Sequence, residues 1–134
     1  MIRLITGKKG SGKTKIIIDR INTAVKNTNG CLVCIEKGET LRRSISYKVR
    51  WCDTEQFAID TFDAFYGFVA GMLAGNYDIK EIYVDGILRI GGRNYDEFGA
   101  MIEKVAMLAK DVKVVFTVSA DPEELPTKVK DFIK

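Results

Sequence analysis

The segment from Gly7 to Thr14 has the residue types and the spacing that a polyphosphate-binding loop needs. Its glycines allow the backbone to curl until successive N–H groups point inward, and a helix that starts at its end adds a positive dipole there. Lys13 is expected to reach the β- and γ-phosphates of a nucleotide, and the Thr14 hydroxyl to bind Mg²⁺. The residues predicted to contact the nucleotide are Gly7, Lys8, Lys9, Gly10, Ser11, Gly12, Lys13, Thr14 and Lys15.

A carboxylate suited to the same cation follows a buried strand much later in the chain. Ile82, Tyr83 and Val84 form an apolar run, and Asp85 ends it. Ligands of open parallel sheets bind at the carboxyl ends of strands, so Asp85 is predicted to hold Mg²⁺, directly or through water. Lys13 and Asp85 are therefore the candidate catalytic residues, and Thr14 and Asp85 the candidate metal ligands. The alternative is that Asp85 is only a turn residue or a helix-capping residue.

Hydrophobic periodicity predicts strands that alternate with helices along the chain. The expected strands are Ile2–Thr6, Cys31–Ile35, Tyr47–Trp51, Ile82–Val84 and Val112–Val118. The expected helices are Lys13–Lys26, Glu39–Ser44, Phe62–Ala74, Tyr95–Ala109 with Asn94 or Asp96 as its cap, and a short one from Pro122, while residues 86–94 are expected to form a loop. This alternation predicts one α/β domain over residues 1–134, with three layers, α/β/α, around a parallel five-stranded sheet.

Composition and charge are those of a globular cytoplasmic protein. The chain has 46% hydrophobic and 29% charged residues, and none of its apolar runs approaches the ~20 residues of a membrane helix. Residues 1–50 carry 12 Lys or Arg against 3 Asp or Glu, an excess that belongs naturally beside a polyphosphate. Cys31 and Cys34 have the spacing of a zinc half-site, but only Cys52 and no histidine could complete it, so buried strand positions are favoured.

The two motifs together resemble those of the P-loop NTPase superfamily. Gly7–Thr14 is similar to Walker A and Ile82–Asp85 to Walker B. Their spacing resembles the RecA/AAA-type branch, with a strand interposed between the two, and this resemblance implies the strand order 5-1-4-3-2. The segments Ile5–Gly7 and Asn76–Gly86 also resemble small bacterial ATP-binding proteins, some of which are labelled twitching-motility ATPases. A motor function is not favoured, because such motors carry a His-containing box and this chain has no histidine.

The catalytic part of that resemblance is incomplete. Members of this branch usually carry a glutamate near the Walker B aspartate, but Gly86 follows Asp85 here. Asp53 or Glu55 is a possible replacement; the other acids within reach by sequence are Asp60, Asp96 and Glu97. Slow hydrolysis is therefore expected. Arg89 and Arg93 are candidates for a γ-phosphate contact or are solvated loop charges, and Ser119 is a candidate for a phosphate or base contact.

The leading functional hypothesis is an ATP-binding, nucleotide-dependent switch or weak ATPase that acts through a protein partner. ATP is preferred to GTP because the chain lacks an N-K-x-D guanine motif. One alternative is a small-molecule kinase, for which residues 86–94 would be the only lid. Another is a nucleic-acid-associated ATPase that uses the basic and aromatic residues of segment 42–51. A half-buried strand explains that segment at least as well, because it separates the charges from the aromatic rings.

Overall fold

The computed structural model describes residues 1–133, whose strands form one five-stranded, all-parallel sheet. Its order is β1-β5-β4-β2-β3. The strands are β1 (Ile2–Thr6), β2 (Cys31–Glu36), β3 (Arg50–Asp53), β4 (Ile79–Asp85) and β5 (Lys113–Val118). Parallel pairing places the carboxyl ends of all five strands along one end of the sheet, which we call the carboxyl edge. The loop after β1 and the residues after β4 come together there.

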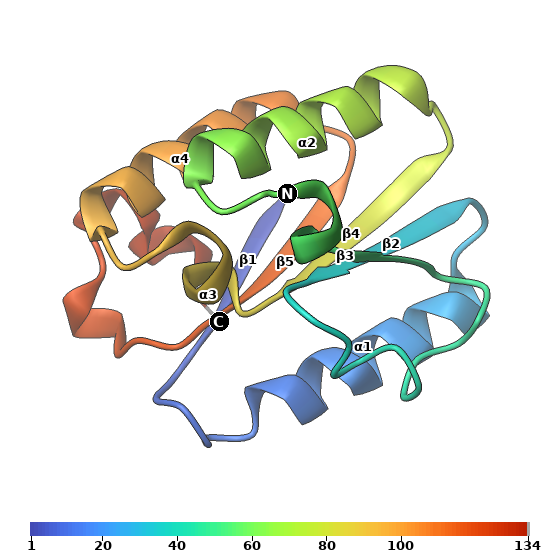
Figure 1. Cartoon of the computed structure of the whole chain (residues 1–134), viewed down its shortest axis with the longest axis horizontal. Coiled ribbons are helices and arrows are strands. Elements are labelled where there is room, and N and C mark those ends of the chain that lie inside the picture. Colours follow the sequence, from blue (N-terminus) through green and yellow to red (C-terminus); the bar gives the residue numbers. More distant parts are fainter. Residues whose placement is uncertain (134) are drawn as a thin grey trace.

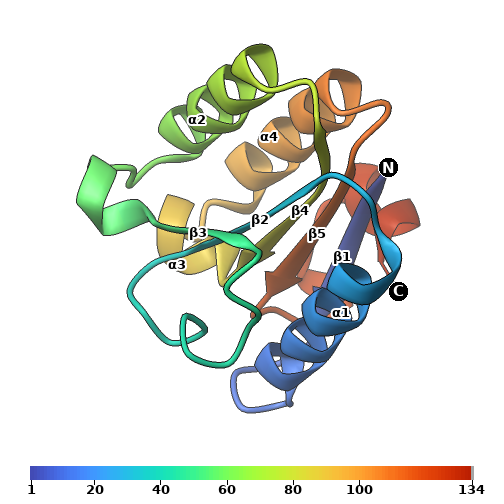
Figure 2. The same cartoon turned by 90° about the vertical axis from the view of Figure 1, so that its right-hand side faces the viewer.

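Helices cover both faces of the sheet, as the three-layer prediction requires (Figures 1 and 2). One face carries α1, and α2 and α4 lie side by side on the other, with the short α3 near the carboxyl ends of the strands. The helices are α1 (Lys13–Asn27), α2 (Phe62–Gly75), α3 (Ile87–Gly91) and α4 (Tyr95–Leu108); short 3₁₀ segments span Thr54–Phe57, Pro122–Glu124 and Thr127–Phe132. None of the described helices combines the length and apolarity needed to cross a membrane.

Two hydrophobic cores, one on each face, result from the alternation of side chains along the strands. In β2, Val33 and Ile35 pack toward α2 and α4, whereas Leu32 and Cys34 pack toward α1. Because β2 is buried on both faces, its sequence is continuously apolar from Cys31 to Ile35, and this is typical of an interior parallel strand. The α1 side is completed by three buried residues between β2 and β3: Leu41, Ile45 and Val49.

The predicted strand order 5-1-4-3-2 is wrong, because the observed order is 1-5-4-2-3. β5 lies between β1 and β4, and β1 is at the edge, where Ile133 makes only an isolated parallel bridge to Leu4. At the other edge β3 pairs only with β2. The short β3 begins with the exposed Arg50, and such a strand suits an edge better than the interior.

Several local predictions also need correction. Residues 39–44 are turns, not a helix, and β3 begins at Arg50, later than predicted, because buried side chains hold residues 37–49 as an irregular segment. The predicted loop 86–94 contains α3, and the predicted terminal helix is two 3₁₀ segments. The cap predicted at Asn94 is confirmed: its side-chain oxygen accepts the Glu97 N–H at 3.0 Å.

Candidate functional site

The Gly-rich loop joins β1 to α1 at the carboxyl edge of the sheet. The Gly7 N–H donates to the carbonyl of Ala120, 3.1 Å away, and this bond fastens the loop to the segment after β5. At the other end Gly12 precedes α1 with φ = 90°, a left-handed conformation that favours glycine. Its carbonyl accepts the Ile16 N–H at 3.2 Å, so the free N–H groups of the first helical turn face the loop.

The Lys13 side chain folds back across this loop. Its Nζ donates to the carbonyls of Gly7 and Lys8 at 2.9 and 2.8 Å, and to Ser11 Oγ at 3.3 Å. Burial lowers the pKa of Lys13, and the negative charge of Asp85 opposes that shift. The ammonium is therefore held inside the loop, beside the free N–H groups of α1. An anion bound there could accept hydrogen bonds from the ammonium and from these N–H groups.

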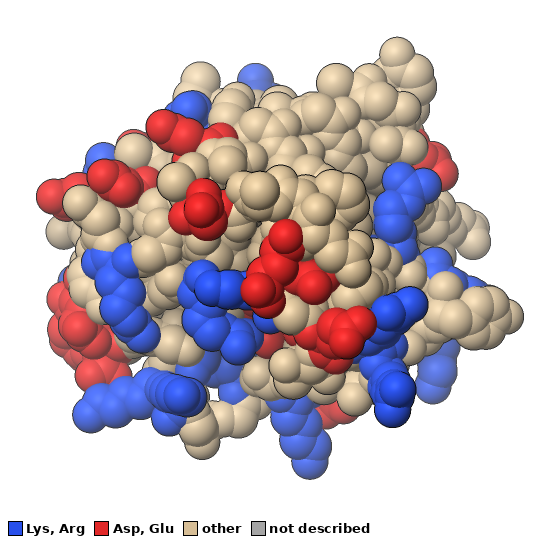
Figure 3. Space-filling view, in the orientation of Figure 1, with Lys and Arg blue, Asp and Glu red and all other residues tan. Residues whose placement is uncertain are grey.

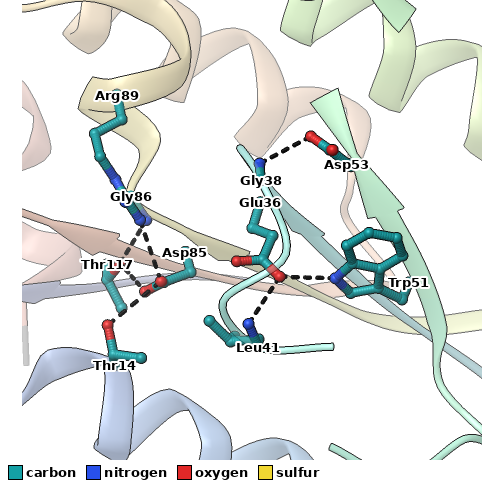
Figure 4. Close-up of polar contacts among 10 residues, drawn as sticks. All are labelled: Thr14, Glu36, Gly38, Leu41, Trp51, Asp53, Asp85, Gly86, Arg89 and Thr117. Carbon is teal, nitrogen blue, oxygen red and sulfur yellow. Dashed lines mark hydrogen bonds and ion pairs between the residues drawn. The ribbon is translucent and has the colours of Figure 1, made fainter. Parts of the chain in front are cut away.

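Asp85 is held at the end of β4 by groups from three other parts of the chain (Figure 4). Its Oδ1 accepts the hydroxyl of Thr117 on β5 at 2.7 Å, and that hydroxyl accepts the Gly86 N–H at 2.7 Å. Its Oδ2 accepts the Thr14 hydroxyl at 3.4 Å and forms an ion pair with Arg89 at 3.5 Å. The structure thus brings together Thr14 and Asp85, which are 71 residues apart in the chain.

The oxygen atoms at this place are of the kind that Mg²⁺ prefers. Thr14 Oγ1 and Asp85 Oδ2 face each other, and the side chain of Asp85 is only 2% exposed. Among residues 1–133 no group of three or more His, Cys, Asp or Glu side chains forms a metal cage. Mg²⁺ usually takes one or two protein oxygens and fills its shell with water and substrate phosphates. The pair of Thr14 and Asp85 fits this mode of Mg²⁺ coordination.

A cavity of about 560 Å³ opens over these residues. Four cationic side chains line it, against the single carboxylate of Asp85. Figure 3 shows Lys and Arg side chains over the lower part of the same face as Figure 1, while a broad area over α2 is free of charge. The lining residues are Lys9, Gly10, Gly12, Lys13, Thr14, Thr40, Asp85, Gly86, Leu88, Arg89, Arg93, Thr117 and Ser119.

The predicted nucleotide-contacting residues divide into two groups in the structure. Lys9, Gly10, Gly12, Lys13 and Thr14 line the cavity. The other four do not line it: Gly7 and Ser11 contact Lys13, Lys8 lies 4.0 Å from Asp121, and Lys15 is exposed on α1.

Arg89 and Arg93 both line the cavity, so they are not merely solvated loop charges. Arg89 lies on α3, and Arg93 follows α3 and donates to the carbonyl of Ser119 at 3.1 Å and to Tyr95 Oη at 3.3 Å. Ser119, also singled out in the sequence, lines the same cavity. The acids considered as water-positioning groups do not line it: Asp53, Glu55, Asp60, Asp96 and Glu97.

Glu36 is a candidate residue that the sequence interpretation missed. It ends β2 in register with Asp85 of β4 and Asp53 of β3, so three carboxylates stand in a row across adjacent strands. Its Oε2 accepts the Leu41 N–H at 2.9 Å and the indole N–H of Trp51 at 2.7 Å. The signal was present in the sequence, because Glu36 ends an apolar run as Asp85 does.

The remaining oxygen of Glu36 is unusual. Glu36 is fully buried and its Oε1 has no hydrogen-bond partner among the described residues. Figure 4 shows this oxygen on the side of Asp85. Burial raises the pKa of Glu36, and the hydrogen bond from Trp51 partly opposes the rise. Glu36 does not line the cavity, so the carboxylate nearest in register to Asp85 is closed off from it.

The predicted separation of charges and aromatic rings in segment 42–51 is wrong. Tyr47 is 92% exposed and lies in the same irregular segment as the exposed Arg42, Arg43 and Lys48. Trp51 is half-buried, and the Arg42 guanidinium lies 4.8 Å from the centre of its ring.

The cysteines of the possible zinc half-site face opposite sides of the sheet. Cys31 packs against the core that contains α2 and α4, whereas Cys34 belongs to the core beneath α1. All three cysteines are free, and burial raises the pKa of the Cys34 thiol. Cys31 and Cys34 therefore cannot bind one ion together without rearrangement of β2.

No protein-family model matches the chain, and no curated protein is detectably similar to it in sequence. The site geometry is therefore the basis for a functional proposal. It combines a cationic cavity, a helix amino terminus aimed at that cavity and a hydroxyl–carboxylate pair of the kind that holds Mg²⁺. Such a combination suits a ligand that carries several phosphates and a divalent cation.

Proposed function

We propose that this chain binds a nucleoside triphosphate with Mg²⁺, ATP in the first instance, in the cavity between the Gly-rich loop and α3. The observation that carries the proposal is the convergence of Lys13, Thr14 and Asp85 on one cavity from two distant parts of the sequence. A Gly-rich turn that binds no ligand would not require Lys13, Thr14 and Asp85 to line one cavity together. ATP rather than GTP is proposed because the sequence has no guanine-binding motif.

The loop would act on the phosphates through charge and orientation. The free N–H groups at the start of α1 and the Lys13 ammonium provide a positive seat for the β- and γ-phosphates. Lys13 now donates to two carbonyls, and a phosphate would replace these weaker acceptors. Thr14 and Asp85 would hold Mg²⁺, which, when bound, offsets phosphate charge.

Slow hydrolysis follows from the position of the carboxylates. Asp85 is occupied by three partners, and Glu36 is buried, does not line the cavity and accepts hydrogen bonds from Leu41 and Trp51. No other carboxylate lines the cavity within residues 1–133. The cavity thus offers groups suited to phosphate and Mg²⁺ but no open base for water. This combination favours a nucleotide-dependent switch or weak ATPase that works through a protein partner.

Calorimetric titration tests the proposal directly. ATP, ADP and GTP are titrated with Mg²⁺ into the wild type and Lys13→Ala, and phosphate release is followed in parallel. Lys26→Ala, which removes a lysine from the last turn of the same helix, is the matched control. We expect ATP to bind to the wild type and to Lys26→Ala, to bind poorly to Lys13→Ala and to be hydrolysed slowly. Absence of binding by the wild type, or equal binding by Lys13→Ala, contradicts the proposal.

A second candidate, a nucleic-acid-associated ATPase, is favoured by the exposure of Tyr47 in the same irregular segment as the exposed Arg43 and Lys48. Aromatic rings and cations that share a solvent-exposed surface are typical of single-strand binding. If this function applies, single-stranded DNA or RNA stimulates phosphate release, the stimulation falls steeply with salt, and Tyr47→Ala reduces it. Stimulation that is independent of salt or of Tyr47 contradicts this candidate.

A further inference from the structure

The cavity-facing oxygen of Asp85 already has a cation beside it. Asp85 Oδ2 lies 3.5 Å from Arg89 Nη2, and the same oxygen accepts the Thr14 hydroxyl at 3.4 Å. The Asp85 side chain is 2% exposed but that of Arg89 is 55% exposed. The carboxylate is therefore fixed in the protein, whereas its cationic partner reaches it from the open side. Arg89 occupies the side of Asp85 that a divalent cation near Thr14 would need.

The backbone after β4 is shaped to seat this guanidinium. Gly86 has φ = 72°, and its carbonyl accepts the Arg89 N–H at 2.9 Å as α3 begins. A Cβ on residue 86 would lie 2.6 Å from both Nε and Nη2 of Arg89. The guanidinium thus packs directly on the Gly86 backbone, and a side chain at residue 86 would displace it from this position. The Gly86 N–H is also part of the chain of hydrogen bonds that fixes Asp85 through Thr117.

We propose that Arg89 is a built-in substitute for the divalent cation: it neutralises Asp85 in the ligand-free protein and moves to the terminal phosphate when Mg²⁺ and the nucleotide bind. The inference rests on the proposed function and extends it by naming how a triphosphate is distinguished from a diphosphate. Two cations on one carboxylate oxygen repel each other, so occupation of this place by Mg²⁺ displaces the guanidinium. Arg89 already lines the cavity, and the acceptor for which it is suited there is a phosphate oxygen.

A terminal phosphate adds charge and oxygen acceptors that a diphosphate lacks. After displacement from Asp85, Arg89 gains a partner when ATP is bound but none when ADP is bound. Removal of Arg89 should therefore lower the affinity for ATP but not for ADP. It should also lower the Mg²⁺ concentration that ADP binding requires, because the competing cation is gone. A purely structural role for Arg89 predicts neither effect.

Arg93 provides a control within the same cavity. It carries the same charge and also lines the cavity, but it donates to Ser119 and Tyr95 and forms no ion pair with Asp85. Loss of its charge should weaken ATP and ADP binding by similar factors. The comparison of the two arginines therefore separates a general electrostatic effect from the specific exchange proposed for Arg89.

The test measures binding of Mg·ATP and Mg·ADP by calorimetry to the wild type, Lys13→Ala, Arg89→Ala, Arg89→Lys and Arg93→Ala, together with a Mg²⁺ titration at fixed ADP. Arg89→Ala should reduce the ATP-to-ADP affinity ratio about tenfold or more, the worth of a charged hydrogen bond, and should shift the Mg²⁺ midpoint lower. Arg89→Lys should keep part of the ratio, and Arg93→Ala should leave it unchanged.

An unchanged ratio in Arg89→Ala overturns the inference while the proposed function stands, provided that the wild type binds ATP and Lys13→Ala does not. Equal weakening of ATP and ADP by Arg89→Ala also overturns it. If the wild type binds neither nucleotide, both the proposed function and this inference are wrong. Thermal unfolding of each variant separates loss of binding from loss of fold.

Discussion

Asp85 and Glu36 are register partners at the ends of adjacent strands, yet their surroundings differ completely. Asp85 faces the cavity, and the side chains of its three partners, Thr14, Arg89 and Thr117, also line that cavity. Glu36 does not line it: one of its oxygens accepts hydrogen bonds from Leu41 and Trp51, and the other has no partner among the described residues. Similar carboxylates at equivalent positions thus differ in their surroundings: Asp85 lines the cavity, whereas Glu36 holds the chain through the hydrogen bonds that it accepts.

Similar hydrogen bonds to the backbone hold the chain along the β2–β3 half of the carboxyl edge. Asp53 accepts the N–H groups of Gly38 and Glu55 at 2.8 and 2.9 Å, and so holds the start of segment 37–49 beside Glu36. On the α1 side, the Asn22 side chain bonds Ser44 and Ser46. The β1–β5–β4 half has the open cavity instead. The carboxyl edge is therefore divided into a cavity side at β1, β5 and β4 and a structural side at β2 and β3.

The largest effect is expected when Glu36 loses its carboxylate. Glu36→Ala leaves the Leu41 N–H and the Trp51 indole without their acceptor in a buried place. We expect a loss of about 2–4 kcal/mol in the free energy of unfolding, measured by urea denaturation. Glu36→Gln, whose amide oxygen can still accept both bonds, should remain within about 1 kcal/mol of the wild type at neutral pH. Equal destabilisation by both variants would show that Glu36 stabilises the fold through the shape of its side chain and not through the hydrogen bonds that it accepts.

Asp85 should affect ligand binding more than stability. Asp85→Asn keeps the volume but removes the charge that a divalent cation needs, so the Mg²⁺-dependent part of ATP affinity should fall about 10- to 100-fold. Calorimetric titration with and without EDTA measures this part. Glu36→Gln is the control on the neighbouring strand and should keep Mg²⁺ dependence. If Glu36→Gln loses the Mg²⁺ dependence of ATP affinity and Asp85→Asn keeps it, Glu36 and not Asp85 is the carboxylate that holds Mg²⁺.

Trp51 offers a smaller perturbation of the structural side. Trp51→Phe keeps a ring for packing but removes the N–H donated to Glu36 Oε2 at 2.7 Å. The expected cost is about 1 kcal/mol of unfolding free energy, with nucleotide affinity unchanged. Circular dichroism is the appropriate probe, because Trp51 is the only tryptophan in the chain. A change in ATP affinity would mean that the structural side is coupled to the cavity.

The smallest effect is a pH dependence of stability that belongs to Glu36. Its pKa is raised in the folded chain from the ordinary 4.5, so the folded state holds this proton more tightly than the unfolded state. The stability that results is complete below pH 4.5 and is lost as the pH rises through the folded value. Urea midpoints from mildly acidic to neutral pH should therefore fall more in the wild type than in Glu36→Gln. Identical pH profiles of the urea midpoint in the two proteins would contradict the assignment of this pH dependence to Glu36.

Local signals were sufficient to predict much of the fold and one half of the site. The spacing from Gly7 to Thr14 and the acid that ends an apolar strand are short-range patterns, and parallel strands necessarily gather their carboxyl ends. The meeting of Thr14 and Asp85 follows from these two facts. Helix ends such as Asn94 are likewise encoded by a few neighbouring residues.

The rest depends on contacts that sequence periodicity does not encode. The predicted order places β1 and β3 beside β4, whereas β5 and β2 lie there, and hydrophobic periodicity does not encode which strands become neighbours. Leu41 and Ile45 have a spacing that suits a helix, but Glu36 and Asn22 bind the backbone around them and hold it as an irregular segment. The difference between Asp85 and Glu36 arises in the same way, because the segment after β2 donates the Leu41 N–H to Glu36 and no hydrogen bond to Asp85.

The most direct test of this division is a backbone NMR titration with Mg²⁺ and a non-hydrolysable ATP analogue. Amide shifts should change at Gly7–Thr14 and around Asp85–Arg93, which surround the cavity of about 560 Å³. The amides of β3 and segment 42–49 should change little, and Lys13→Ala should abolish the response. Shifts that cluster on segment 42–49, or no shifts at all with the folded wild type, would contradict the assignment of the cavity as the nucleotide site.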